Sequence, residues 1–335
     1  MNVGLKTQIL PAGAATAAAA ARALADGGLV AFPTETVYGL GADAANPAAI
    51  ARLYQAKGRP AFHPLITHVG DLGAARQIGR FDRDALALAE AFWPGPLTLV
   101  LPKTGDCAVA DLATAGLDTV AIRIPAHPVA QEILRLFGGP VVAPSANLSG
   151  HVSPTTAAHV QSDLAGRIDL IVDGGPVAVG VESTIVGCFD EAVLLRPGGL
   201  PRGDIERVLG RKLVQPPGDA DSGRPVAPGM LASHYAPRTL VRLDACNVEP
   251  GEALLAFGPV AVSGVDAATS VMNLSARGDL DEAAANLFGY LRALDVHGAH
   301  TIAVMPVPHH GLGEAINDRL RRAAVPRRPR EGGHP

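Results

Sequence analysis

The chain has 335 residues, of which 48% are hydrophobic and 18% are charged. At about 150 residues per domain, this length predicts two domains. The charged share is below the usual ~25%, which is typical of a compact globular protein and excludes extended disorder for most of the chain. Lys and Arg number 28 against 32 Asp and Glu, a net charge of −4. No overall positive field is therefore available to hold a nucleic acid, and any such role would need a local basic patch.

The cysteines and the longest uncharged run indicate the cellular compartment of the protein. Cys107, Cys188 and Cys246 are odd in number and form no C-x-x-C pair, which argues against a disulfide framework and a zinc site and fits a reducing cytoplasm. The run 136–162 lacks charged side chains but carries many hydroxyls and amides, so it is too polar to span a bilayer. We expect a cytoplasmic protein that makes no use of a membrane.

The amino-terminal part alternates apolar runs with capped helical segments. Asn46 followed by Pro47 predicts a helix start, and Gly58 predicts its end after Lys57. Helices are expected over 14–26, 47–57, 82–92, 128–137 and 154–164, with Ser153 as a candidate cap of the last. Strands are expected over 29–32, 65–69, 97–101, 119–124, 140–143, 168–172, 181–186 and 193–195. This mixture predicts an α/β fold.

The segment 215–229 is rich in proline, glycine and short polar residues and predicts a linker. Beyond it, strands are expected over 240–243, 253–257 and 301–305, with helices over 281–294 and 312–322, which favours a small parallel-sheet domain. The predicted organisation is a first domain over 10–212, a linker over 213–237, a second domain over 238–325 and a disordered tail over 326–335.

Familiar catalytic motifs are missing from the sequence. It contains no G-x-x-x-x-G-K-[ST], G-x-S-x-G, H-E-x-x-H or EF-hand pattern, which excludes the common P-loop, serine-hydrolase and zinc-protease classes. The segment 39–44 distantly resembles a dinucleotide fingerprint, but no acidic residue follows a second strand at the required place, so a turn is favoured.

Two polar segments could bind an anion. Lys57, Arg59 and His63 lie on a loop stiffened by glycine and proline, a pattern suited to phosphate oxygens or, alternatively, to a solvated loop at a helix end. Ser145 and Asn147 follow a predicted buried strand with no carboxylate nearby. They could face an anion or form a turn held by their own hydrogen bonds.

Polar residues inside apolar strands need partners. The segment 182–184 is predicted to lie inside a strand, where Glu, Ser and Thr need hydrogen bonds or a ligand. Arg123 shares a strand face with Thr119 and is costly to bury unless it meets a carboxylate or phosphate. Glu35 and Glu182 are the internal alternatives to a ligand. His68 is expected to be an ordinary half-buried strand histidine, and 234–235 a docking element or a contact of a lid.

Together these segments resemble the YrdC-type threonylcarbamoyl-AMP synthases. Eight motifs in the same order carry the resemblance over about residues 10–210, at 33–40, 57–60, 64–68, 93–98, 123–125, 145–150, 182–184 and 196–198. The segments 228–230 and 233–237 look like those of the family's long, two-domain form. The resemblance implies a twisted mixed-sheet α/β domain with a cleft, followed by a smaller Rossmann-like domain.

The resemblance also implies an activity. Such an enzyme is a nucleotidyltransferase that joins L-threonine, bicarbonate and ATP into L-threonylcarbamoyladenylate and releases pyrophosphate. A separate transferase then uses the product to modify the adenosine beside the anticodon of certain tRNAs. Mg²⁺ is expected as a companion of ATP, held mainly by the nucleotide phosphates.

Roles can be carried over to the matching positions. The resemblance implies a threonine pocket formed by Thr36, His68, Arg123, the backbone at Ala143, and Ser183. It implies nucleotide contacts from Lys57, Arg59, His63, Thr119, Ser145, Asn147, Ser153, Arg196 and Tyr235. His63 stands where the family usually has asparagine. Because histidine titrates near neutral pH, we expect nucleotide affinity to depend on pH.

Two other functions stay open at this point. An RNA-binding module is one, although the net charge of −4 does not favour it. Carbamoyl transfer from carbamoyl phosphate, as in related hydrogenase-maturation enzymes, is the other, but the acylphosphatase and zinc-finger segments of those proteins are missing from this sequence. Within the synthase interpretation, residues 215–235 are a candidate lid that would protect an unstable carbamate from water.

Overall fold

The computed structural model describes residues 5–60, 63–214, 235–260, 262–296 and 298–325. The chain divides into two compact units. Unit 1 comprises residues 1–149 and 153–230, and unit 2 comprises residues 150–152 and 231–335. Most of the predicted linker and lid, and the predicted tail, lie outside the described residues. The predicted domain boundaries therefore stay predictions.

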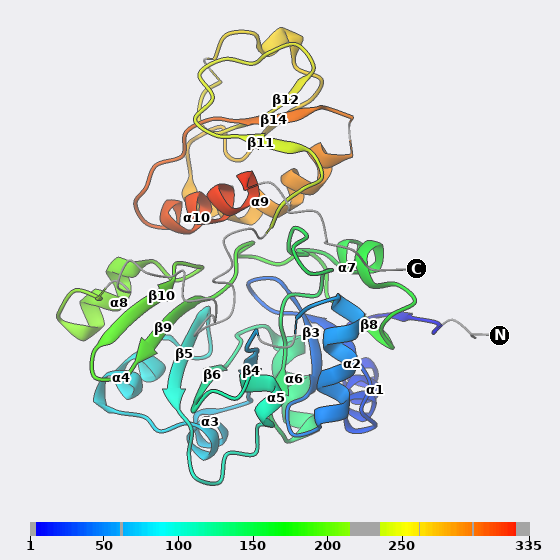
Figure 1. The fold of residues 1–335 in the computed structure, drawn as a ribbon, viewed down its shortest axis with the longest axis vertical. Coiled ribbons are helices and arrows are strands. Elements are labelled where there is room, and N and C mark those ends of the chain that lie inside the picture. Colours follow the sequence, from blue (N-terminus) through cyan, green and yellow to red (C-terminus); the bar gives the residue numbers. More distant parts are fainter. Residues whose placement is uncertain (1–4, 61–62, 215–234, 261, 297, 326–335) are drawn as a thin grey trace. The chain divides into compact units, whose positions relative to one another are not determined.

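Unit 1 is built on a mixed sheet whose ten described strands follow the order β1-β8-β2-β3-β7-β4-β6-β5-β9-β10 (Figure 1). β4 runs parallel to β6, whereas β5 runs antiparallel to β6, so the predicted mixed α/β sheet is confirmed. The strands are β1 (Gln8–Pro11), β2 (Val30–Pro33), β3 (Tyr38–Asp43), β4 (Ile66–His68), β5 (Leu97–Pro102), β6 (Thr119–Arg123), β7 (Val141–Val142), β8 (Leu170–Asp173), β9 (Thr184–Cys188) and β10 (Ala192–Arg196).

Helices pack on this sheet and bury its apolar side chains. They are α1 (Ala14–Ala25), α2 (Pro47–Lys57), α3 (Leu72–Ile78), α4 (Arg83–Phe92), α5 (Asp111–Thr114), α6 (Pro128–Phe137), α7 (Ala157–Leu164) and α8 (Arg202–Leu209). One core cluster joins Leu53 of α2 and Leu88 of α4 to Ile122 of β6. A second cluster joins Leu24 of α1 and Ile133 of α6. Because strand side chains alternate in direction, the residues next to Ile122 in β6 point to the opposite face of the sheet.

Capping residues set the ends of α2 as predicted. The Asn46 side chain accepts hydrogen bonds from the Ala48 and Ala49 amides, and Gly58 ends the helix in the left-handed conformation, with φ of 59°. The start of α7 differs from the prediction. Thr156, not Ser153, caps it by accepting a bond from the His159 amide, because the Ser153 hydroxyl is engaged elsewhere.

The prediction that residues 182–184 lie inside a strand is wrong for two of the three. β9 begins at Thr184, so Glu182 and Ser183 lie in the loop before it. The physical reason is that their carbonyls bond outside a ladder. The Glu182 carbonyl accepts from the Gly199 amide, and the Ser183 carbonyl accepts from the Arg196 guanidinium.

Unit 2 is a parallel sheet in the order β11-β14-β12-β13 among the described residues, which confirms the predicted small parallel-sheet domain. Its strands are β11 (Leu240–Arg242), β12 (Glu252–Ala256), β13 (Val271–Asn273) and β14 (Thr301–Val304), and its helices are α9 (Leu280–Asp295) and α10 (Gly313–Ala324), with a 3-10 turn at Val265–Ala267. Within the described part of the chain, no helix combines the length and hydropathy needed to cross a bilayer.

Candidate active site

The ends of β4 and β6 place two functional side chains together. His68 and Arg123 are the last residues of these parallel strands, stand opposite one another in register, and are buried at 2% and 4% exposure. Ala143, just after β7, donates its amide to the Ile66 carbonyl of β4. Since parallel strands end at one edge of a sheet, His68 and Arg123 meet at this edge. β7 runs antiparallel to β4, so Ala143 lies level with Ile66, two residues back along β4 from His68.

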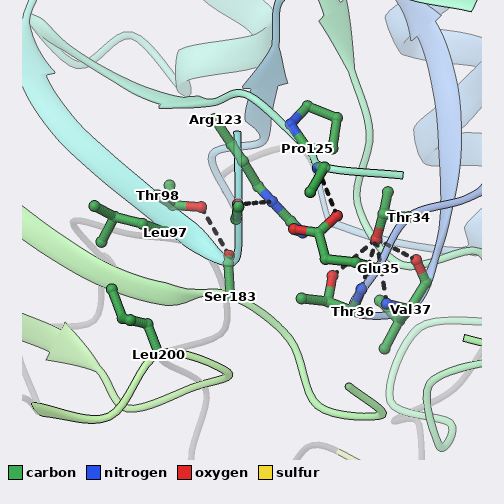
Figure 2. Close-up of polar contacts among 12 residues, drawn as sticks. Thr34, Glu35, Thr36, Val37, Leu97, Thr98, Arg123, Pro125, Ser183 and Leu200 are labelled. Atoms are coloured by element: carbon green, nitrogen blue, oxygen red, sulfur yellow. Dashed lines mark hydrogen bonds and ion pairs between the residues drawn. The ribbon is translucent and has the colours of Figure 1, made fainter. Parts of the chain in front are cut away.

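Arg123 is held by contacts from two other segments. Its Nη2 donates to Glu35 Oε1 at 2.7 Å, and its Nε donates to the Gly95 carbonyl at 3.3 Å. Figure 2 shows the Glu35 and Arg123 side chains pointing toward one another. Burial alone would raise the pKa of Glu35, but the charge and hydrogen bond of Arg123 outweigh burial, so the pKa of Glu35 is lowered and the pair is ionised.

The turn between β2 and β3 fixes the direction of the Thr36 hydroxyl. Thr34 Oγ1 donates to the Val37 carbonyl at 2.7 Å and lies 2.8 Å from Thr36 Oγ1 (Figure 2). A hydroxyl has one proton, and that of Thr34 is committed to the carbonyl, so Thr36 must be the donor between the two hydroxyls. The oxygen of Thr36 is thereby left as a hydrogen-bond acceptor.

Ser183 is held from both sides. Its Oγ lies 2.7 Å from Thr98 Oγ1 of β5 and accepts from Arg196 Nη2 at 3.3 Å. Gly198 presses on the backbone behind it, because a Cβ at Gly198 would lie 2.4 Å from the Glu182 carbonyl and the Thr184 amide. Only glycine permits this approach. Arg196, expected at the nucleotide, therefore directly contacts a residue of the predicted threonine pocket.

His68 is neutral at physiological pH. Burial lowers its pKa to about 3, and the nearby charge of Arg123 acts in the same direction. Its Nδ1 lies 3.3 Å from the Ile66 carbonyl, which can only accept, so the favoured tautomer carries the proton on Nδ1. Nε2 then remains as a second neutral hydrogen-bond acceptor.

Lys57, at the end of α2, organises the loop after β7. Its Nζ donates to the carbonyls of Ser145 and Asn147, at 2.5 Å each, and its own carbonyl accepts from the Ser149 amide. Lys57 is 2% exposed, and burial, with the nearby charge of Arg59, holds the pKa of its ammonium well below 10.5. Gly39 of β3 bridges to Ser145, which ties this loop to the sheet.

The His63 side chain does not titrate near neutral pH in this structure, and the predicted dependence of nucleotide affinity on pH stays a prediction. Burial, followed by the charge of Arg59, lowers the pKa of His63 to about 4, so the side chain stays neutral near pH 7. Its carbonyl accepts from the Tyr54 hydroxyl at 2.8 Å, and Arg59 Nη2 donates to the Pro64 carbonyl at 3.2 Å.

Ser153 and Glu182 form a buried pair. Ser153 Oγ donates to Glu182 Oε1 at 2.5 Å, and the two residues are 0% and 6% exposed. This contact answers the question of which carboxylate satisfies Arg123 internally. Arg123 meets Glu35, and Glu182 meets Ser153.

Thr119 and Tyr235 are the two remaining predicted nucleotide residues. Thr119 begins β6, four residues before Arg123, and its hydroxyl makes no hydrogen bond within the described residues. Tyr235 belongs to unit 2, where it is 1% exposed. Its ring stacks on Phe288 with centroids 5.4 Å apart, and the Arg319 guanidinium lies 5.2 Å from its centroid.

Sequence reasoning missed Thr34 and Thr98 as site residues. Both lie within the motifs at 33–40 and 93–98, and Thr98 is a polar residue among leucines and valines of β5. A buried hydroxyl needs a partner, which is the signal that could have found Thr98. Across the described ranges, no group of three or more His, Cys, Asp or Glu side chains could hold a metal ion.

Known proteins match both parts of the chain. A family model of the Sua5, YciO and YrdC proteins, described as Telomere recombination, matches residues 22–198. A second, described as Threonylcarbamoyl-AMP synthase, C-terminal domain, matches residues 201–325. The threonylcarbamoyl-AMP synthase of Bacillus subtilis is 43% identical over 322 residues, with 92% of each chain covered.

Solved structures give the same result. The crystal structure of P. abyssi Sua5 complexed with L-threonine is similar with a TM-score of 0.84 and 38% identity, covering 96% of this chain and 97% of that one. E. coli YciO, with a TM-score of 0.53 and 23% identity over 58% of this chain and 96% of that one, shares the fold. Over nearly its full length, the chain belongs to the threonylcarbamoyl-AMP synthase family in its two-domain Sua5 form.

Proposed function

We propose that unit 1 joins L-threonine, bicarbonate and ATP into L-threonylcarbamoyladenylate and releases pyrophosphate, as a nucleotidyltransferase that serves tRNA modification. The observation that carries this proposal is the buried guanidinium of Arg123 beside His68, where Nε and Nη2 are engaged and no hydrogen bond among the described residues uses Nη1. A buried cation with one nitrogen left for a ligand suits a single carboxylate.

The hydrogen-bonding character of the pocket suits L-threonine. Arg123 supplies the positive charge for the carboxylate, whereas the Thr36 oxygen and His68 Nε2 are neutral acceptors for N–H or O–H groups. Ser183 and the backbone at Ala143 complete the set that we assign to threonine. The relative from P. abyssi, whose structure holds L-threonine, supports this assignment.

The nucleotide site that we propose lies around the loop that Lys57 holds. Ser145 and Asn147 would face the phosphates, with Arg59 and His63 on the turn after α2. Arg196 would lie between the two substrates, since it contacts Ser183 of the proposed threonine pocket. Ser153, which donates to Glu182, is the remaining nucleotide residue of unit 1 in this set. For Thr119 and Tyr235 the assignment to ATP rests on the family resemblance alone.

The chemistry needs positioning more than a dedicated nucleophile. Bicarbonate and the threonine amine condense to a carbamate with loss of water. A carbamate oxygen then bonds to the α-phosphorus of ATP as the bond to the β-phosphate oxygen breaks and pyrophosphate leaves. Two anions must meet, so the protein contributes by orienting them and by placing positive charge and N–H donors around them.

Mg²⁺ fits this scheme as a companion of ATP. Because no carboxylate or histidine cluster among the described residues could hold a metal, the nucleotide phosphates would supply most of its ligands and the metal would offset their charge. We place the reaction in the cytoplasm, since all three cysteines are free, and a separate transferase would consume the product.

The test is pyrophosphate release with ATP and bicarbonate, measured with and without L-threonine. We expect release to depend on threonine in the wild-type protein and to be lost in Arg123→Ala, which should still bind a non-hydrolysable ATP analogue. Threonine-independent release, or full threonine affinity in Arg123→Ala, would contradict the proposal.

A further inference from the structure

Glu35 is the one acidic side chain that the structure brings to Arg123 among the described residues. It lies in the turn between β2 and β3, 88 positions from Arg123 in sequence, and its side chain is 13% exposed. From the sequence, Glu35 was only a candidate partner of Arg123, and the pocket assignment gives it no role in binding. Its contacts indicate such a role.

Both carboxylate oxygens of Glu35 are used. Oε1 accepts from Arg123 Nη2 at 2.7 Å, and Oε2 accepts from the Ala126 amide at 2.9 Å. The second bond anchors the carboxylate to the backbone just past β6. Glu35 therefore cannot follow Arg123 if the guanidinium turns, and it defines one fixed direction for the Nη2 donor.

The guanidinium is planar, so two fixed nitrogens fix the third. Glu35 holds Nη2, the Gly95 carbonyl holds Nε at 3.3 Å, and Nη1 is thereby held in one place. Without Glu35, only the long bond to Gly95 would remain. A buried arginine that lacks its carboxylate partner is strongly unfavourable and would reorient toward other oxygens.

We propose that Glu35 is a positioning residue for the amino-acid substrate: by holding Arg123 at Nη2, it leaves Nη1 as the donor for the substrate carboxylate and so sets the preference for a free carboxylate. This inference rests on the proposed role of Arg123. Electrostatics alone would have the opposite effect, because the negative charge of Glu35 repels a second carboxylate. The two views thus predict changes of opposite sign in Glu35→Gln, which removes the charge.

Selectivity between L-threonine and L-threoninamide measures this role, because the amide lacks the negative carboxylate. The variants are Glu35→Gln, which keeps the size but loses the charge, and Glu35→Asp, which keeps the charge but is too short to reach Arg123 and Ala126 together. Glu132→Gln is the matched control, since Glu132 pairs with Arg135 on the surface of α6. Binding is measured by calorimetry at pH 7, and pyrophosphate release gives the KM for L-threonine.

We expect the wild-type protein and Glu132→Gln to prefer L-threonine about thirtyfold, the factor that one charge-assisted hydrogen bond provides. In both Glu35 variants the preference should fall to about threefold and the KM for L-threonine should rise about tenfold, with affinity for an ATP analogue unchanged. Loss of folding would lower all affinities alike and leave the ratio unaltered, so the ratio reports positioning.

The outcomes separate the two claims. A wild-type protein with no preference for L-threonine over its amide would show that Arg123 does not bind the carboxylate, and the assignment of the pocket would fail. A wild-type preference that persists within twofold in both Glu35 variants while their affinity for the ATP analogue is unchanged, or tighter threonine binding in Glu35→Gln, would overturn the positioning role alone. Because Glu35→Asp keeps the charge of the pair, the test stands even if Glu35→Gln is poorly folded.

Discussion

The ammonium of Lys57 lies 2.5 Å from the carbonyl oxygen of Asn147, a residue 90 positions later in the chain. The same ammonium bonds the Ser145 carbonyl. A side chain that the family resemblance assigns to the nucleotide thus holds the loop on which two other nucleotide residues stand. Its contribution to ATP binding is to fix the shape of that loop as well as to add charge.

Replacing Lys57 should therefore weaken nucleotide binding. In Lys57→Met, the two carbonyls lose their donor in a buried place, which costs about 1–3 kcal/mol for each unsatisfied group. We expect affinity for a non-hydrolysable ATP analogue to fall about ten- to hundredfold by calorimetry. Lys103→Met is the control, because Lys103 pairs with the exposed Asp111. Unchanged analogue affinity in Lys57→Met would show that the loop keeps its shape without the ammonium.

Thr98 should contribute to threonine binding without touching the substrate. Thr98→Val keeps the shape of the buried side chain and removes its hydrogen bond to Ser183 Oγ. We expect a stability loss of about 1 kcal/mol and a five- to tenfold rise in the KM for L-threonine, since Ser183 is less well oriented. Thr98→Ser should restore both values. A KM that stays at the wild-type value in Thr98→Val would count against this role.

Acid should destabilise the fold through His68. The unfolded chain binds a proton at this residue below pH 6.5, whereas the folded protein does so only near pH 3. In this window the unfolded state binds more protons, so the free energy of unfolding falls by up to about 1.4 kcal/mol for each unit that the pH drops. Urea unfolding between pH 7.5 and 5 should show a shallower pH dependence for His68→Gln than for the wild type.

The control for this experiment is His309→Gln, which replaces an exposed histidine of unit 2. It should leave the slope of unfolding free energy against pH unchanged. Equal slopes in His68→Gln and the wild type would mean that His68 is protonated in the folded protein. His63, whose pKa is about 4, should behave like His68 but over a narrower range.

Tyr235 should stabilise unit 2 whether or not it contacts ATP. Its ring packs between Phe288 and Arg319, so Tyr235→Ala should cost about 3–5 kcal/mol in the unfolding of unit 2. Tyr235→Phe keeps the ring and should be near neutral for stability. If Tyr235→Phe nevertheless raises the KM for ATP, the hydroxyl has the ligand role that the family resemblance implies. An equally stable Tyr235→Ala would refute the packing role.

Local sequence signals predicted the elements whose ends are set by residues of the same segment. α2 follows from Asn46, Pro47 and Gly58, because each satisfies backbone groups or adopts the required φ without help from the rest of the chain. β3, with the sequence YGLGAD, was missed because two glycines weaken the strand pattern. Its strand conformation comes from pairing with β2 and β7, which a local pattern does not contain.

The sequence predicted which residues form the site but not which of them contact one another. Arg123 called for a carboxylate or a ligand, and the sequence offered Glu35 and Glu182 equally. The choice depends on which turn reaches the end of β6, and that is decided by the sheet order. Likewise, the sequence does not show how deeply His63 is buried, and that burial is what lowers the pKa of its side chain to about 4.

The close approach of Gly198 limits how the amino-acid specificity of this enzyme can be redesigned. The Ser183 hydroxyl contacts that of Thr98. The backbone of Ser183 lies against Gly198, where there is no room for even one methyl group. On the proposed role of Ser183 in threonine binding, this backbone cannot move to admit a bulkier amino acid without displacing Thr184, the first residue of β9. Engineering toward larger substrates would begin at the turn that carries Thr36, which is held by the Thr34 and Thr36 hydroxyls as well as by backbone hydrogen bonds from Val179 and Gly180.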